Sequence, residues 1–472
     1  MTAMSSESAG SAATPCGKTP WWTPQLAGPV IAAAVVRLTL LAAALRRVGS
    51  SAFFSTDTSG YLEPGRNLLL HGRFISDGIP ELFRTPGYPL FLAITSLAGP
   101  IAAVVANVIL SVFSVLLVWR LGRTAFGEER IALGAAWLFA FEPLSVAHSI
   151  LLLSDTLFLA LFLLSLEHLA EFLRSRRLRL LATAGLWLAA ATFVRPVTYY
   201  LPVALALGLI VVLARDSNLR WKAPAVLLVC VLPWLAAWQI RNWVEAGYGG
   251  FSSITDENLY FYSTADLIAH VEHRNFVDVQ NELDARCGRG CGEPINPDQH
   301  DAAQNPEQAG LKQGPRLAFM RSESLRVIRA HFGVYLSACI THFFEAALYP
   351  GAGSFDSLLY PKDPRHIDGL IAYKGPTRGS ISLAKSYPWA AAEKAAFVAV
   401  LLALYLLAAR GVFRAGMHNA CLWLLLGTSL YFLAASSATT GPGATARYRL
   451  PVMPAVCILA TAGFPRAKAR QR

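Results

Sequence analysis

The chain carries ten apolar runs whose lengths suit the crossing of a membrane. A transmembrane helix needs about 20 predominantly apolar residues, within a range of roughly 17–25. Because the hydrocarbon core holds no water, each run must satisfy its own backbone hydrogen bonds, and repeated runs therefore fold as a bundle of helices. The runs lie at residues 27–47, 98–119, 131–148, 151–171, 179–196, 199–214, 223–240, 389–409, 417–436 and 448–464.

The composition agrees with this interpretation and excludes several classes of protein. Of the 472 residues, 54% are hydrophobic and 15% are charged, whereas a soluble domain carries about 25% charged residues. So little charge excludes a disordered chain and a nucleic-acid-binding domain, and it argues against a soluble enzyme. The predicted fold class is an all-α polytopic integral membrane protein, with membrane lipids around it and no nucleic acid as partner.

Basic residues in the short connections predict the orientation of the chain in the membrane. The net charge is +11, and Lys and Arg accumulate in the cytoplasmic loops of membrane proteins. Five basic groups fall on one side if both termini are cytoplasmic, while Arg46 and Arg47 fall on the opposite side. The five groups lie within residues 120–130, 174–179, 215–222, 410–414 and 466–472.

An eleventh apolar run, at residues 333–349, is ambiguous. If this run crossed the membrane, the basic groups after it would move to the outer side, so we expect an interfacial or re-entrant helix. The stretch before it suits a helix lying on the membrane surface, because apolar residues recur near a helical period among arginines. These apolar residues are Leu317, Met320, Leu325 and Ile328.

The predicted spans divide the chain into segments with different surroundings. Two outer loops stand out, one at 48–90 and one at 241–332. The second is too long to be a simple connection, and such loops in compact proteins tend to bind ligands or cover sites. The predicted segments are a cytoplasmic tail at 1–26, a membrane module at 27–240, the large outer loop at 241–332, an interfacial helix and outer loop at 333–388, C-terminal spans at 389–464 and a basic tail at 465–472.

Four short motifs follow one another along most of the chain. The first lies in the first outer loop, the second opens the fourth span, the third ends the span before the large loop, and the fourth follows the ninth span. In this order and topology they resemble the GT-C-type glycosyltransferases of the protein-mannosyltransferase and aminoarabinose-transferase group, in its bacterial branch. The motif residues are Asp57, Tyr61, Arg84 to Pro89, Ser154 to Thr156, Pro233, Trp234, Arg241, Asn242 and Arg447 to Pro451.

The resemblance implies a GT-C-type membrane bundle of about ten spans that acts as an inverting transferase. Such an enzyme takes a sugar from a polyprenyl-phosphate donor on the outer face of the membrane, here expected to be a bacterial inner membrane. The resemblance implies that Asp57 is the catalytic base, that Asp155 is a second functional carboxylate and that Arg84 lies near the donor phosphate. Where relatives have an acidic pair, this sequence has Asp57 followed by Thr58.

The chemistry of the expected reaction supports one base and no general acid. Glycosidases need two carboxylates because an alkoxide leaves, whereas a phosphate ester leaves as a stable anion. An ordinary aspartate has a pKa near 4, so we expect partial burial to raise the pKa of Asp57 toward the working pH. Arginine binds phosphate with two parallel hydrogen bonds and keeps its charge at low dielectric, which suits Arg84, Arg447 and Arg195 as donor-phosphate ligands.

Several candidate residues could instead serve the structure, and the sequence leaves the choice open. Arg195 either contacts the donor phosphate or pairs with Glu142 or Asp155, because a charge in a membrane span needs a partner. Tyr61 and Tyr88 either bind substrate or belong to an aromatic belt. Arg241 is a further candidate for substrate binding.

The same choice applies to the charged residues of the motifs. Asp57 is either the base or the N-cap of a helix. Asp155 is either a functional carboxylate or a residue at the membrane boundary. Arg84 and Arg447 are either phosphate ligands or anchors to lipid headgroups.

The sequence points to no certain cofactor. His270 and His273 lack further ligands at the usual spacing of a zinc site, although a pair of carboxylates could hold a divalent cation. Cys287 and Cys291 lie in the predicted outer loop, where oxidation is possible, and form either a disulfide or two free thiols.

Two rival functions remain open, namely a transporter or flippase for lipid-linked sugars and a non-catalytic sugar-binding membrane subunit. A transporter predicts inverted repeats with broken spans in matching halves, which this sequence does not display. The transferred sugar is open, as is the acceptor, which could be lipid A, a polysaccharide, another lipid or a protein.

Overall fold

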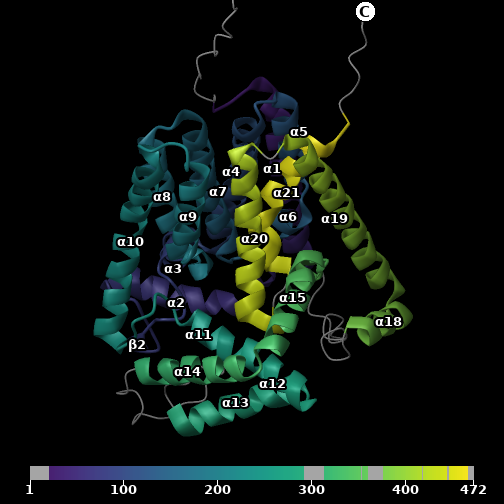
Figure 1. The fold of residues 1–472 in the computed structure, drawn as a ribbon. Coiled ribbons are helices and arrows are strands. Elements are labelled where there is room, and N and C mark those ends of the chain that lie inside the picture. The colour runs from purple at the N-terminus through teal and green to yellow at the C-terminus, as the bar shows by residue number, and fades with distance from the viewer. Residues whose placement is uncertain are drawn as a thin grey trace, which may run out of the picture.

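The structure is a computed structural model that describes residues 21–291, 313–351, 353–359, 376–416, 418–443 and 446–465. Almost all of its regular structure is helical, in agreement with the predicted class (Figure 1). One small antiparallel hairpin, β1 (Ile75–Ser76) and β2 (Ile79–Pro80), interrupts the helices in the first outer loop. Its two-residue turn, Asp77-Gly78, has positive φ at both positions, as a tight hairpin requires.

Six helices in the described part of the chain are long and apolar enough to cross a membrane. A seventh candidate exists if α14 (Gly314–Ala330) and α15 (Phe332–Leu348), which meet at a bend of 101°, count as one broken span. The six are α1 (Ala27–Arg47, with the preceding turn from Pro24), α4 (Pro100–Phe126), α7 (Asp155–Ser175), α10 (Leu219–Ala246), α19 (Pro388–Ala415) and α20 (Ala420–Thr440).

The other four predicted spans contain shorter or interrupted helices, so the total of ten crossings stays a prediction. The run at 131–148 is broken because Pro143 starts a new helix, whose first backbone N–H groups donate to the Glu142 carboxylate. The run at 448–464 begins as a 3₁₀ segment, Ala446–Val452. The helices concerned are α5 (Glu129–Ala140), α6 (Pro143–His148), α8 (Leu178–Val194), α9 (Leu201–Val212) and α21 (Met453–Gly463).

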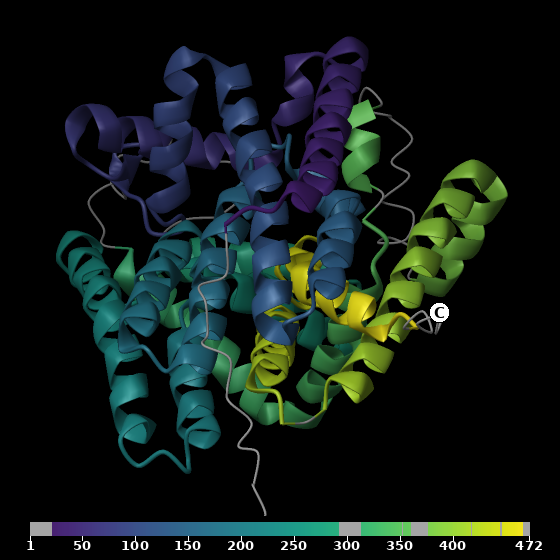
Figure 2. The same ribbon diagram turned by 90° about the horizontal axis from the view of Figure 1, so that it is seen from above.

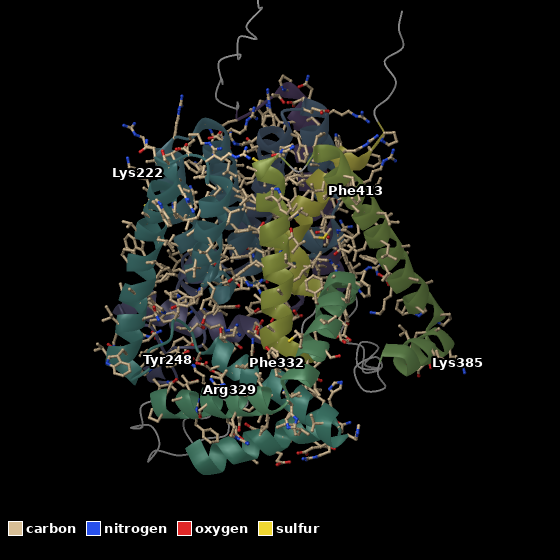
Figure 3. All side chains as sticks on the ribbon, viewed as in Figure 1. Lys222, Tyr248, Arg329, Phe332, Lys385 and Phe413 are labelled. Atoms are coloured by element: carbon tan, nitrogen blue, oxygen red, sulfur yellow. The ribbon has the colours of Figure 1, made fainter. Side chains whose placement is uncertain are left out.

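Basic residues predicted to share one side of the membrane do gather at one end of the bundle. Arg130 and Arg414 both donate to backbone carbonyls at the end of α21, and Arg174 donates to the carbonyl of Thr124. Figure 3 shows Lys222 at the same end as Phe413. The shared end predicted from the charges is therefore present, while the membrane side that it faces stays a prediction.

One member of these basic groups has a different environment from the one expected. Arg120 is buried and pairs with Glu167, at 2.5 Å from Nη2 to Oε1, and its guanidinium lies 3.7 Å from the ring centroid of Trp21. A buried charge needs such partners because desolvation is costly. Arg120 therefore joins α4 to α7, and it does not simply face lipid headgroups.

The large loop predicted at 241–332 forms a packed layer of helices at the opposite end of the bundle (Figure 1). This outer layer has its own apolar core, which includes Leu82, Tyr260, Leu283 and Met320. The stretch predicted to be a surface helix is α14 in this layer. The layer consists of α11 (Ile254–Asn258), a π-helical segment (Leu259–Thr264), α12 (Ala265–Glu272), α13 (Phe276–Cys291) and α14.

Helix α15 returns from the outer layer to the bundle and runs beside α20 (Figure 1). The hydroxyl of Tyr335 donates to the carbonyl of Ala438, and His342 contacts Asp266 on α12 at 3.0 Å. The ambiguous run at 333–349 is therefore a helix that leaves α14 at a sharp angle. Its interfacial or re-entrant position relative to the membrane stays a prediction.

The first outer loop is fixed to the bundle by α2 (Thr56–His71) and α3 (Gly87–Thr95). Helix α2 starts with a capping box, in which the backbone N–H of Ser55 donates to the Thr58 hydroxyl and the Ser55 side chain accepts from the backbone N–H of Thr58. The Thr58 hydroxyl also donates to the carbonyl of Leu152. A Cβ on Gly65 would lie 2.2 Å from the carbonyl oxygen of Pro89, so α2 and α3 touch through backbone. The start of α2 is thus held against the segment before α7.

Short helices and 3₁₀ turns complete the described chain. Figure 2, seen from above, shows α19 in yellow-green at the right edge and the teal helices around α10 at the lower left. The remaining elements are α16 (Gly353–Leu359), α18 (Pro376–Ser386) and the 3₁₀ turns Pro24–Leu26, Ser50–Phe53, Ser96–Ala98, Pro196–Thr198 and Gly441–Gly443.

Helices α19 and α21 pack together through two glycines. A Cβ on Gly411 would lie 1.9 Å from the carbonyl oxygen of Leu459, and a Cβ on Gly463 would lie 2.0 Å from that of Leu407. Small residues at helix crossings allow this approach of two backbones, and in a membrane such packing is a main source of helix association.

We expect Gly411→Val to lower the melting temperature of the purified protein, because the added side chain has no room beside α21. Overpacking of this kind costs about 1–3 kcal/mol. Gly427→Val on α20 is the matched control, since a Cβ there meets nothing within 4 Å. Equal melting temperatures for the two variants would show that α19 can move away from α21 without cost.

Candidate active site

A cavity of about 520 Å³ lies where the bundle meets the outer layer. Its walls come from the start of α2, the loop before α3, the ends of α7 and α8, and the segment before α21; α11, α13 and the π-helical segment close it from the outer side. The charged residues that line it are Asp57, Arg84, Arg195, Glu257, Asp284 and Arg447.

Asp57 lies in the first turn of α2 and receives a guanidinium on each oxygen of its carboxylate. Arg84 donates from Nη2 to Oδ1 at 2.8 Å, and Arg447 donates from Nη1 to Oδ2 at 2.5 Å. The carboxylate is 32% exposed and faces the cavity. One side chain therefore joins the first outer loop to a segment 390 residues later in the chain.

Asp155 is the first residue of α7 and is fully buried behind the cavity, at 0% exposure. Its Oδ2 accepts from Nε of Arg447 at 2.8 Å, and its Oδ1 accepts from Arg195. His148 lies 3.6 Å away, from Nδ1 to Oδ2. Arg195 thus forms the pair with Asp155 that the sequence left open, while also lining the cavity.

Arg447 links the two carboxylates, because it contacts Asp57 with one nitrogen and Asp155 with another. The result is a continuous row of alternating charges, which we call the ion row: Arg84, Asp57, Arg447, Asp155 and Arg195. It contains three arginines and two aspartates, so the row itself carries one net positive charge.

The local backbone explains how the arginines reach the cavity. Pro196 follows Arg195 and ends α8 at the cavity rim, since a proline disfavours helical conformation in the residue before it. Arg447 and Arg449 lie on the same 3₁₀ segment but contact different partners. Arg449 donates to the carbonyls of Ala346, Ala347 and Tyr349 at the end of α15, so it fixes the segment from behind.

Tyr61 belongs to the same site, one helical turn after Asp57. Its hydroxyl accepts from Nη1 of Arg84 at 3.2 Å and lies 3.3 Å from Oγ of Ser154, and the Arg84 guanidinium lies 4.5 Å from its ring centroid. Tyr88 is fully buried and packs edge-on against Tyr61, with ring centroids 4.8 Å apart. Tyr61 therefore lines the cavity, and Tyr88 supports it from inside.

The electrostatics of Asp57 differ from the expectation based on sequence. Burial alone would raise the pKa of its carboxyl, but the guanidinium groups of Arg84 and Arg447 outweigh burial and hold that pKa well below its usual range. The expected rise toward the working pH is therefore wrong for this arrangement of side chains. The reason is that the motif shows which charges are present but not that two arginines converge on one carboxylate.

Glu257 on α11 is a cavity residue that no motif predicted. Burial raises the pKa of its carboxyl to about 7, against the opposing effects of its hydrogen bond with Ser253 and of Arg316. It lies in a polar stretch of the large loop with no motif around it, so no signal in the sequence set it apart from solvent-exposed acids.

Two other predicted residue sets lie elsewhere. Arg241 donates to the carbonyls of Phe74 and Glu81 at 2.5 and 3.0 Å, and so ties the end of α10 to the first outer loop outside the cavity. The side chains of Cys287 and Cys291 lie outside the described residues, so their disulfide stays a prediction.

The described side chains do not form a group of three or more His, Cys, Asp or Glu residues arranged to hold a metal ion. His270 is bonded to its own helix through the carbonyl of Asp266.

We expect Asp155→Asn to destabilise the protein more than Asp57→Asn. Removing one partner of a buried ion pair costs about 3–5 kcal/mol, because the remaining charge is left without compensation. Asp155 is fully buried and holds two arginines, whereas Asp57 is 32% exposed. Thermal melting of the two purified variants tests this order, and a larger loss for Asp57→Asn would contradict it.

Glu257 gives a pH-dependent prediction. In the unfolded chain a glutamate has a pKa of about 4.3, and in the folded protein the pKa of Glu257 is about 7. The stability linked to this group is therefore complete below the pKa of the unfolded state and is lost as the pH rises through the pKa of the folded state. Glu257→Gln should therefore melt at a higher temperature than the unsubstituted protein at pH 8 and at the same temperature near pH 4.5. A pH-independent difference would contradict this.

Comparison with solved structures gives distant likenesses. The archaeal oligosaccharyltransferase AglB from Archaeoglobus fulgidus, in complex with an inhibitory peptide and a dolichol-phosphate, is 13% identical with a TM-score of 0.48; the match covers 93% of this chain and 50% of AglB. The chain thus spans half the length of AglB.

ArnT from Cupriavidus metallidurans gives TM-scores of 0.36 in the apo state and 0.39 bound to undecaprenyl phosphate, at 13% and 12% identity. These matches cover 93% and 92% of this chain and 77% of ArnT. At such TM-scores the likenesses carry no argument about activity.

Among curated proteins no significant sequence match is found. Residues 85–238 match the family described as dolichyl-phosphate-mannose-protein mannosyltransferase. This region contains Asp155 and Arg195, begins directly after Arg84, and ends before the segment that carries Arg447. The resemblance inferred from the motifs is thereby confirmed over residues 85–238, which match this family of glycosyltransferases.

Proposed function

We propose that the protein is an inverting transferase that moves a sugar from a polyprenyl-phosphate donor to an acceptor of the cell envelope. The observation that carries this proposal is the net charge of the ion row. Three arginines and two aspartates leave one positive charge beside a cavity, and the phosphodiester of such a donor brings one negative charge. The family match supports the same donor class, since its description names a dolichyl-phosphate sugar.

The donor phosphate is proposed to bind Arg84, Arg447 and Arg195. All three line the cavity, and guanidinium groups form paired hydrogen bonds with phosphate oxygens. The donor's lipid tail would lie along the spans while its sugar enters the cavity. The outer layer would then face the extracytoplasmic space of a bacterial inner membrane, with both termini in the cytoplasm.

Asp57 is proposed as the base, and donor binding would prepare it for that task. In the absence of a donor, Arg84 and Arg447 hold the pKa of Asp57 too low for efficient proton uptake. When a phosphate shares those guanidinium groups, their attraction for Asp57 weakens and its pKa rises. Deprotonation of the acceptor would thus depend on the presence of the donor.

The proposed reaction is a single displacement. The acceptor hydroxyl gives its proton to Asp57, and its oxygen forms a bond to the anomeric carbon. The bond between that carbon and the phosphate oxygen breaks, and the electron pair leaves with the polyprenyl phosphate. Attack opposite the leaving group inverts the anomeric centre. Asp155 is too deeply buried to reach the acceptor, so its proposed role is to position Arg447 and Arg195.

The remaining predicted residues have supporting roles in this proposal. Tyr61 would contact the substrate directly, because it lines the cavity beside Arg84. Tyr88 would hold the Tyr61 ring in place, and Arg241 would hold the first outer loop. The outer layer is proposed to cover the site and to select among lipid A, polysaccharide, lipid and protein acceptors.

Asp57→Asn should leave the protein folded and reduce transfer by a factor of about 10²–10⁴, the usual contribution of a general base. The assay follows labelled sugar from a set of undecaprenyl-phosphate-linked sugars into envelope acceptors, with purified protein in lipid nanodiscs. Asp278→Asn, an exposed change on α13, is the matched control and should transfer normally.

The same assay separates the rival functions. Near-normal transfer by Asp57→Asn would remove Asp57 from the role of base. Movement of label across vesicles by the unsubstituted protein without a new glycosidic bond would identify a transporter. Binding of donor with neither movement nor transfer would identify a non-catalytic subunit.

A further inference from the structure

The outer wall of the cavity has a chemical character different from that of the ion row. It is formed by α11, the π-helical segment and α13, and it presents two carboxyl groups, amide side chains and two aromatic residues. Among its members are Glu257, Asn258, Asn281 and Phe261. None of these four carries a positive charge, so this wall is not suited to a phosphate.

Glu257 is one of the two acidic residues of this wall. It makes no ion pair with any described residue, and its Oε1 accepts a hydrogen bond from the Ser253 hydroxyl. Asp57, in the same cavity, is by contrast held by two arginines. The second carboxylate oxygen of Glu257 is therefore available for a ligand.

The charged groups around Glu257 come from three elements. Arg316 lies on α14, and Glu81 and Arg84 lie in the loop before α3. Asp284 on α13 lines the same cavity. Burial has the largest effect and raises the pKa of Glu257 to about 7; Arg316 and Arg84 favour its ionised form, and Glu81 opposes it.

The backbone of the wall is fixed in an unusual form. The segment that follows Asn258 is π-helical, over Leu259–Thr264, and such segments are rare and concentrate at functional sites. Its Tyr262 lies against Gly441 and Gly443, where a Cβ would come within 3.2–3.3 Å. Gln280 on α13 donates to the carbonyl of Phe261 at 3.2 Å. The wall is thus anchored next to the segment that carries Arg447.

We propose that this outer wall is a saccharide subsite, in which Glu257 accepts a hydrogen bond from one sugar hydroxyl and Asn258 and Asn281 bond its neighbours. Adjacent hydroxyls of a sugar both donate and accept, and a carboxylate with amides satisfies both needs. The ring of Tyr262, which is only partly buried in the cavity lining, offers an apolar surface for the C–H face of the sugar. The proposal rests on the proposed function, and the sugar is either that of the donor or one in a glycan acceptor.

Binding measurements on full-length protein in lipid nanodiscs test the proposal and separate the two sources. The probes are undecaprenyl phosphate, undecaprenyl phosphate linked to mannose, glucose or arabinose, and a set of free envelope oligosaccharides. The variants are Glu257→Gln, Asn258→Ala and, as matched control, Glu272→Gln, an exposed change in the same outer layer. Thermal melting verifies that each variant is folded.

We expect the unsubstituted protein to bind an oligosaccharide, or to bind at least one glycosylated lipid more tightly than undecaprenyl phosphate. Glu257→Gln should weaken that sugar-dependent binding about tenfold or more. Binding of undecaprenyl phosphate alone should not change, nor should any binding by Glu272→Gln. Loss on the glycosylated lipids assigns the subsite to the donor sugar, and loss on the oligosaccharides assigns it to the acceptor.

The pH dependence of sugar binding distinguishes a direct contact of Glu257 with the sugar from a purely structural role of this residue. Sugar-dependent binding by the unsubstituted protein should strengthen from pH 6 to pH 8 as Glu257 ionises, and Glu257→Gln should show no such change. If either Glu257→Gln or Asn258→Ala fails to fold, the sugar binding of the other variant is compared with that of the unsubstituted protein.

Two results would overturn the saccharide subsite. One is equal binding of every sugar-bearing probe by Glu257→Gln and the unsubstituted protein. The other is a protein that binds undecaprenyl phosphate equally well with and without a sugar and binds no oligosaccharide. Failure of the proposed function gives a different pattern, in which undecaprenyl phosphate itself does not bind or binds unchanged when Arg447 is replaced by alanine.

Discussion

The pairing of Arg447 with both Asp57 and Asp155 is the interaction on which the site depends. The three residues come from a 3₁₀ segment near the end of the chain, from the first outer loop and from the head of α7. At low dielectric an unpaired arginine or aspartate would be costly, so each charge requires the others. The requirement brings together segments that the chain order keeps far apart, and it sets the position of the cavity between the bundle and the outer layer.

The sequence could predict the members of the ion row but not their arrangement. In a chain with 15% charged residues, charges at the outer ends of spans are few, and the motifs single out Asp57, Arg84, Asp155 and Arg447. The structure brings these four together with Arg195. The convergence of two arginines on Asp57, which lowers its pKa, depends on side-chain directions that no motif contains.

The fold shows the same division between what composition determines and what packing determines. Apolar runs predicted the helices well, and the charges predicted which loops share one end. Run length could not predict where a helix breaks, because a proline at the start of α6 and the 3₁₀ form of Ala446–Val452 interrupt runs that are predominantly apolar. The large outer loop was predicted from its polarity, whereas its helical layer depends on a small apolar core that is dispersed in the sequence.

The 3₁₀ segment Ala446–Val452 contains two arginines that contact different parts of the molecule. Arg447 belongs to the ion row, and Arg449, two residues later, is bound to carbonyls at the end of α15. Helix α15 is in turn joined to the outer layer through the contact of His342 with Asp266. These contacts therefore form a continuous path from the outer layer to the guanidinium beside Asp57. Under the proposed function, a displacement of the outer layer that uncovers the cavity for an acceptor would also shift the arginine that binds the donor phosphate.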